Sequence, residues 1–238
     1  MSAEVAIQGI AQDYVTLFLA VPLLIISLII SRNGSLKWRF VFEGTLGYFL
    51  LTYTFYFSMA MYNKFFLVYV ALMGLSFFSL ALTILTFNRN ALPSVFNEKA
   101  PLKLSGSFLM FSAISIAMLW LSIVLPPLLD GSIYPKAVEH YTTLIVQGFD
   151  LGIALPLSFV IGLLLFKRQP FGYLLGPIYL VFLSLLMTAL VAKLVYLGIF
   201  GYTIFPAIII IPLFQIISII LTLRLLINID SVRNDNLV

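Results

Sequence analysis

The chain has 238 residues, of which 62% are hydrophobic and only 9% are charged, with a formal net charge of +4. Soluble domains carry roughly 25% charged residues, so this composition excludes a soluble globular protein and indicates a polytopic membrane protein. The basic residues lie in short segments between long apolar runs, which is typical of membrane orientation signals, so we expect no nucleic-acid partner. The chain has no cysteine, which excludes disulfides, a thiolate nucleophile and thiol metal sites.

Seven apolar segments are long enough to cross a hydrocarbon core of about 30 Å. We therefore predict an all-α fold, a bundle of seven transmembrane helices that forms one domain over residues 1–238. No Lys or Arg precedes the first apolar segment, so we expect it to be retained rather than cleaved as a signal peptide. The predicted spans cover residues 14–31, 40–61, 65–87, 107–126, 143–166, 171–196 and 203–227.

The basic residues predict the orientation of this bundle, because cytoplasmic loops of membrane proteins are enriched in Lys and Arg. Ten of the thirteen fall on one side: Arg32, Lys37, Arg39, Arg89, Lys99, Lys103, Lys167, Arg168, Arg224 and Arg233. Three fall on the other side: Lys64, Lys136 and Lys193. We therefore predict a multi-pass protein of the cell membrane with the N-terminus outside, the C-terminus in the cytoplasm and the lipid bilayer around it.

Spans one to three and five to seven have the same orientation in this topology, with span four linking them. An outer acid, a proline and an inner base follow each other in span one and again in span five: Asp13, Pro22 and Arg32, then Asp150, Pro156 and Lys167. Parallel repeats of this kind occur in small transporters. The order is also compatible with two unrelated helices that run from outside to inside.

Asp150 is the strongest candidate for a functional residue, because an ionisable group within a span is costly and usually faces a partner, a cavity or a pathway. Helical rise places it roughly 25 Å from Lys167, and Asp13 roughly 28 Å from Arg32, so both acids lie near the outer boundary of the hydrocarbon. We predict an outward-facing ligand site of Asp150, Gln147, Asp13 and Lys193, in which Asp150 pairs with Lys193. Further candidates for this cluster are Asn63 and His140. The alternative is a structural cluster that holds two helices together.

The second span carries polar side chains on one helical face, including Tyr48, Thr52 and Tyr56. Such a face either lines a cavity for a polar solute or packs against another helix, and small and hydroxyl residues more often mark packing. Glu43 lies where the second span is predicted to begin, a position that the helix dipole favours for an acid without any function.

Several classes of protein are excluded by what the spans lack. Residues 203–223 contain no lysine, which argues against a retinal protein, and His140 is the only histidine, so a multi-histidine metal site is excluded. We expect no cofactor, no metal and no enzymatic activity. A lipid-modifying enzyme that uses only carboxylates stays open as the third choice.

The segment from Phe149 to Pro156, continued from Leu163 to Leu175, resembles a stretch of uncharacterised bacterial membrane proteins with seven helices. The early segment from Ala11 to Thr16 and the segment from Phe65 to Leu72 are similar to the same group. The resemblance covers about half of the chain. It implies a seven-helix fold in a prokaryotic cell membrane and implies no activity.

Our first functional hypothesis is therefore the binding or transport of a small solute or ion at the outward-facing polar site. The second is a receptor-like or accessory membrane subunit that acts through a membrane protein partner. An enclosed cavity at the acids favours the first hypothesis, and a direct pair between Asp150 and Lys193 favours the second. A lateral opening from the bilayer to the acids favours the lipid-modifying enzyme.

Overall fold

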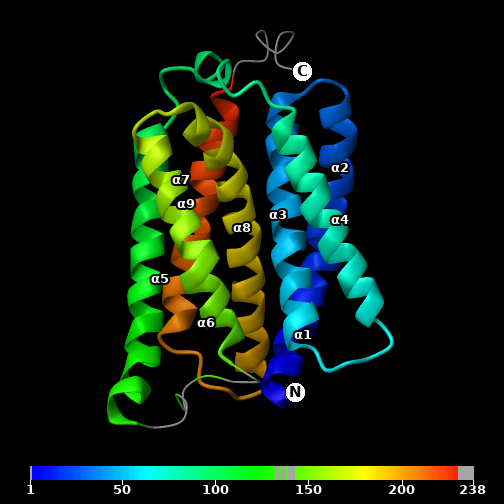
Figure 1. Cartoon of the computed structure of the whole chain (residues 1–238), viewed down its shortest axis with the longest axis vertical. Coiled ribbons are helices and arrows are strands. Elements are labelled where there is room, and N and C mark those ends of the chain that lie inside the picture. The colour runs from blue at the N-terminus through cyan, green and yellow to red at the C-terminus, as the bar shows by residue number, and fades with distance from the viewer. Residues whose placement is uncertain (1, 132–134, 136–137, 139–142, 230–238) are drawn as a thin grey trace.

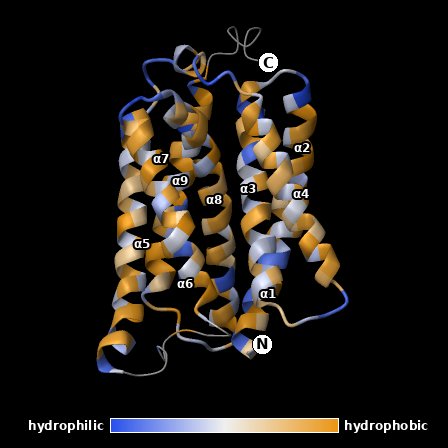
Figure 2. Cartoon of the chain, in the orientation of Figure 1, coloured by the Kyte–Doolittle hydropathy of each residue, from blue (hydrophilic) through white to orange (hydrophobic). Residues whose placement is uncertain are grey.

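The computed structural model describes residues 2–131, 135, 138 and 143–229 (Figure 1). This part of the chain is a bundle of long helices, and it contains no β-strand beyond an isolated bridge between Phe96 and Ile229. The predicted all-α fold class is thereby confirmed. Figure 2 shows apolar residues along the middle of the helices and hydrophilic residues concentrated at the two ends of the bundle, as expected for a membrane-embedded protein.

Six helices in the described part are long and apolar enough to cross a membrane. Two of them contain a π-helical turn: α1 (Ala3–Val15), η1 (Thr16–Ala20) and α2 (Val21–Arg32) are continuous, as are α6 (Ile145–Phe149), η3 (Asp150–Ala154) and α7 (Leu155–Phe166). The other four are α4 (Phe66–Leu85), α5 (Leu102–Asp130), α8 (Pro170–Ile199) and α9 (Ala207–Ile227). A 3₁₀ turn, η2 (Leu92–Ser94), lies in the loop between α4 and α5.

The predicted span at 40–61 forms α3 (Leu36–Met59), a helix of 24 residues that is less apolar than the six. Its sequence includes Glu43 and several tyrosines and threonines. α3 packs against α2, α4 and α8 in the middle of the bundle (Figure 1). The polar side chains of Glu43, Thr45, Tyr48 and Thr52 are buried there. The sequence of α3 is therefore less apolar than that of a helix that exposes most of its surface to lipid.

The first helix begins well before the predicted start at residue 14. Its N-cap is Ser2, whose hydroxyl accepts a hydrogen bond from the Val5 backbone N–H at 3.2 Å. Such a cap satisfies one of the free amide groups at the start of a helix. The early residues include two acids and two glutamines, so hydropathy alone does not reveal that they continue the helix.

Each π-helical turn is followed closely by a proline. Pro22 comes two residues after η1, and Pro156 comes two residues after η3. A proline lacks the backbone N–H and crowds the carbonyl of the preceding turn, and in membrane helices a local π turn can accommodate both effects. π turns are also frequent at functional sites, so the polar residues beside them are candidates for a site.

Part of the first half of the bundle recurs in the second half. The π turn, the helix that follows it and the start of the next helix recur 134 residues later: Thr16 and Asp150, Val21 and Leu155, Leu36 and Pro170. α2 and α7 are both 12 residues long. In this register Asp13 corresponds to Gln147 and Thr16 to Asp150, so the two acids that we matched from the sequence are not equivalent.

The first half, from α1 to α4, and the second half, from α6 to α9, each form a unit of three helices. The two units meet where α3 packs against α8. A Cβ atom added to Gly44 would lie 2.4 Å from the Val181 Cβ and 2.7 Å from the Ile178 carbonyl oxygen. Real Cβ atoms do not approach other atoms so closely, so only glycine permits this contact. Gly106 of α5 and Gly162 of α7 approach each other in a similar way.

Candidate functional site between α1 and α3

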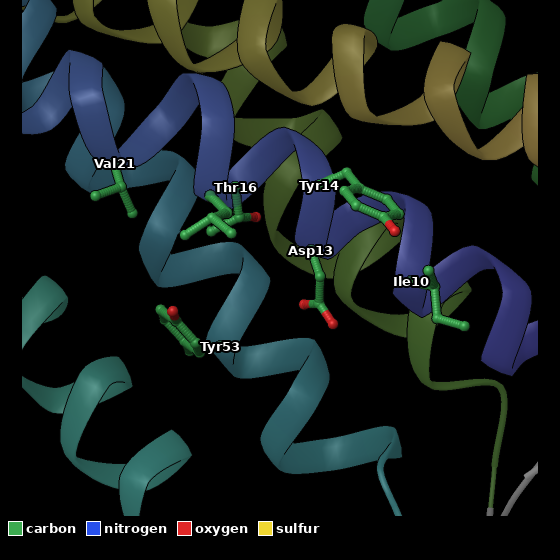
Figure 3. Close-up of a pocket in the computed structure, with 7 residues that line it drawn as sticks. Ile10, Asp13, Tyr14, Thr16, Val21 and Tyr53 are labelled. Atoms are coloured by element: carbon green, nitrogen blue, oxygen red, sulfur yellow. The ribbon is translucent and has the colours of Figure 1, made fainter.

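Asp13 lines a cavity of about 370 Å³ between the first helix and α3 (Figure 3). The carboxylate points from α1 towards α3, where Tyr53 lies opposite it. The lining residues are Ile10, Asp13, Tyr14, Thr16, Leu17, Val21 and Tyr53. About half of the surface of Ile10, Tyr14 and Leu17 is exposed, at 51%, 49% and 58%. The cavity therefore opens on the side of the bundle.

Tyr56 of α3 fixes one oxygen of the carboxylate. The Tyr56 hydroxyl donates a hydrogen bond to Asp13 Oδ1 at 2.5 Å and also reaches the Gly9 carbonyl oxygen at 3.3 Å. Asp13 itself is exposed. Its second oxygen makes no hydrogen bond within residues 2–131 or 143–229, so it is open to a ligand in the cavity.

A buried hydrogen-bond network lies directly behind the cavity and joins α1 and η1 to α3. The Gln12 side-chain amide donates to the Tyr48 hydroxyl at 2.8 Å and to the Thr52 hydroxyl at 3.1 Å. The Thr16 hydroxyl lies 3.0 Å from the same Tyr48 oxygen and donates to the Gln12 carbonyl oxygen at 2.9 Å. All four side chains are buried. The network holds the first π turn in a fixed position beside the cavity.

Aromatic rings form the wall of the cavity on the α3 side. The Tyr53 ring stacks on Tyr69 of α4 at 6.4 Å between centroids, and the Tyr56 ring meets Tyr69 edge-on at 5.4 Å. On the α1 side, Tyr14 packs against Tyr196 of α8 at 5.8 Å. These contacts restrict the rotation of the rings that face Asp13. None of Tyr48, Thr52 and Tyr56 lines the cavity. Their hydroxyls bond to side chains of the first helix, so their shared face packs against another helix, which was one of its two interpretations.

Asp150 is held by a different partner from the predicted one. The Trp120 indole N–H of α5 donates to Asp150 Oδ2 at 2.8 Å. No ion pair joins Asp150 to Lys193 in the described structure, and the half-buried Lys193 makes no hydrogen bond there. The predicted pair is wrong, because α5 supplies the indole N–H as the partner at this position. Asp13 and Asp150 are therefore bound by separate helices in separate halves of the bundle.

The remaining predicted residues have varied positions. Gln147 is buried on α6, which packs against α3. Asn63 shapes the turn before α4, where its side chain accepts from the Phe65 backbone N–H at 2.8 Å and donates to the Met61 carbonyl oxygen at 2.8 Å. His140 lies outside the described residues.

Glu43 is a buried acid whose importance the sequence did not reveal. Its side chain is 0% exposed, and neither carboxyl oxygen has a hydrogen-bond partner in the described part of the chain. Because α3 begins at Leu36, Glu43 lies about 10 Å inside the helix rather than in its first turn, so the helix dipole does not explain it. The guanidinium of Arg39 donates instead to the Thr83 carbonyl and the Thr86 hydroxyl.

Gln12, Thr16, Tyr53 and Trp120 are further site residues that the prediction missed. Gln12 and Thr16 are four residues apart and therefore share a helix face, which was a usable signal. In contrast, no local pattern identifies Trp120 as the partner of Asp150, because the two residues lie on different helices. Within the described ranges no group of three or more His, Cys, Asp or Glu residues could hold a metal ion.

Comparison of the chain with protein-family models, with curated proteins and with solved structures gives no match. The geometry and chemistry of its own side chains are therefore the basis for assigning a function.

Proposed function

We propose that the chain is a seven-span protein of a prokaryotic cell membrane, with α3 as the span that joins the six apolar helices. The helices alternate in direction along the bundle (Figure 1), and the loops at the end where α2 and α7 finish carry most of the basic residues. By the positive-inside rule this end is cytoplasmic. The N-terminus and the cavity at Asp13 then lie towards the outside.

The proposed topology predicts that single cysteines introduced as Ser2→Cys and Val238→Cys react with a membrane-impermeant maleimide from opposite sides. The native chain has no cysteine, so each variant reports one position. In intact cells the first variant is expected to label and the second to label only after the cells are opened. Labelling of both variants in intact cells would contradict the seven-span topology.

We further propose that this protein binds a small solute at the cavity between α1 and α3 and transports it. The observation that carries this proposal is the second oxygen of Asp13, which no described residue hydrogen-bonds, in a cavity of about 370 Å³. Ligand sites typically measure about 300–1,000 Å³ and combine apolar walls with a few polar groups, which describes this lining. The opening on the side of the bundle is also what a lipid-modifying enzyme would need, but an enzyme that uses only carboxylates needs an acid and a base, and Asp13 is the single carboxylate among the described lining residues.

Transport is favoured over binding alone by the construction of the bundle around the cavity. η1 begins three residues after Asp13 and is followed by Pro22, and both interrupt the regular hydrogen bonding of the helix. The two similar units meet along α3 and α8, and many transporters move one such unit against the other around a fixed binding site. All described lining residues of the cavity belong to the unit from α1 to α4. A movement of this unit against the other would change how far the cavity is exposed to the outside.

The test is a thermal-stability screen of the purified protein against ions, sugars, amino acids, amines and lipids, with Asp13→Asn and Asp150→Asn as matched variants. A ligand at 100 times its dissociation constant is expected to stabilise the parent by about 2.7 kcal/mol. The same ligand should fail to stabilise Asp13→Asn. It should still stabilise Asp150→Asn, because the Asp150 carboxylate already accepts a hydrogen bond from the Trp120 indole and does not line the cavity. If no compound stabilises the parent, the proposal fails and an accessory subunit becomes the better interpretation.

A further inference from the structure

We propose, on the basis of the proposed binding function, that the solute is an organic ammonium ion with apolar substituents, held between the Asp13 carboxylate and the Tyr53 ring.

The charge of the cavity selects for a cation. Among the described residues that line the cavity, Asp13 is the only acid and none is basic. Its Oδ1 accepts from Tyr56, which is neutral, and no cationic side chain of the part of the chain that the structure describes lines the cavity beside it. At membrane depth charges interact more strongly than in water, so an anion would be repelled and a neutral solute would leave the charge unpaired.

The tyrosines select an ammonium group over a small metal ion. A cation within about 6 Å of an aromatic ring is attracted to the ring face, and quaternary ammonium ligands are often bound in this way. Tyr53 lines the cavity from α3, across from the residues of the first helix (Figure 3). Its ring is held by stacking on Phe49 and Tyr69. Calcium needs six to eight oxygen ligands, roughly, which this lining does not supply.

The apolar part of the lining indicates what the ammonium group carries. Ile10, Leu17 and Val21 contribute hydrocarbon surface beside the carboxylate. A solute that buries alkyl groups against them removes apolar surface from water, which favours binding. The lateral opening admits such a molecule either from the outer aqueous phase or as the ammonium headgroup of a bilayer lipid.

The test compares choline with 3,3-dimethylbutanol, its uncharged isostere, by calorimetric titration of the purified protein. Choline is expected to bind the parent, and the isostere is expected to bind at least about tenfold more weakly. Asp13→Asn and Tyr53→Leu should each weaken choline binding by about tenfold or more. Asp150→Asn is the matched control that should retain choline binding, because Trp120 holds this acid in the other half of the bundle. Tyr53→Phe keeps the ring and should bind choline more tightly than Tyr53→Leu.

The source of the ammonium group is distinguished by repeating the titration in nanodiscs. With phosphatidylcholine nanodiscs, a lipid-headgroup site would be occupied and choline binding would be weakened relative to phosphatidylglycerol nanodiscs. Equal binding in both would identify a free amine as the solute. Either result supports the ammonium inference.

The ammonium inference and the proposed function can fail separately. If the isostere binds as tightly as choline, or if a sugar or an anion binds in an Asp13-dependent way, the ammonium inference is overturned while the binding function stands. If neither choline nor any compound of the stability screen binds, both are overturned.

Discussion

Gly44→Val is expected to destabilise the bundle by about 3 kcal/mol or more. The first added carbon would lie 2.4 Å from the Val181 Cβ and 2.7 Å from the Ile178 carbonyl oxygen. The carbonyl belongs to the backbone of α8 and cannot rotate away, so α3 and α8 must separate. Overpacking of this kind costs about 1–3 kcal/mol and occasionally more, and valine adds two further methyl groups. The effect should be visible as a large fall in the thermal unfolding midpoint in detergent.

Gly74→Val on α4 is the matched control for this experiment. An added Cβ at Gly74 meets nothing within 4 Å, so the same substitution should leave the unfolding midpoint nearly unchanged. Equal destabilisation of the two variants would show that the loss at Gly44 comes from helix propensity rather than from the contact between α3 and α8.

Tyr48→Phe is expected to destabilise the protein by about 1–2 kcal/mol, because its hydroxyl takes part in two of the buried hydrogen bonds that join the first helix to α3. The Gln12 amide donates to this oxygen at 2.8 Å, and the Thr16 hydroxyl lies 3.0 Å from it. The phenylalanine ring would fill the same space, so no cavity contributes to the loss. Both partners are buried and have no access to water that could replace the lost bonds. Equilibrium unfolding of the purified protein measures the change.

Tyr62→Phe removes the same hydroxyl from a tyrosine that is 86% exposed. We expect no measurable change there, because water satisfies an exposed hydroxyl in the folded and unfolded states alike. A Tyr48→Phe protein as stable as this control would mean that the Gln12 network contributes little to the joining of α1 and α3.

Hydropathy predicted the positions of the long helices well, because the bilayer demands one long apolar helix for each crossing. It failed at the start of the first helix, where the polar residues from Glu4 to Asp13 continue the helix after a serine cap. It also made α3 look like an ordinary span, although this helix lies in the middle of the bundle and carries a buried acid.

The prediction of the site depended on whether the partners were local in sequence. Asp13 was identified because an acid near the end of a span stands out by itself. The pair of Asp150 with Lys193 was inferred from depth alone, and depth does not determine which helix lies beside which. Trp120 donates to Asp150 from a helix that precedes it in the chain, so only the packing of α5 against the second π turn reveals the contact.

The recurrence of helix boundaries after 134 residues also suggests how such a protein arises. A group of three antiparallel helices ends on the opposite side of the membrane from where it begins. A second copy fused directly to its end would therefore be inverted. α5, which belongs to neither group, returns the chain to the first side, so the second copy runs parallel to the first. Gene duplication followed by the gain of one connecting helix produces this arrangement. In the ancestor, the contact now made by α3 and α8 would have joined two identical chains.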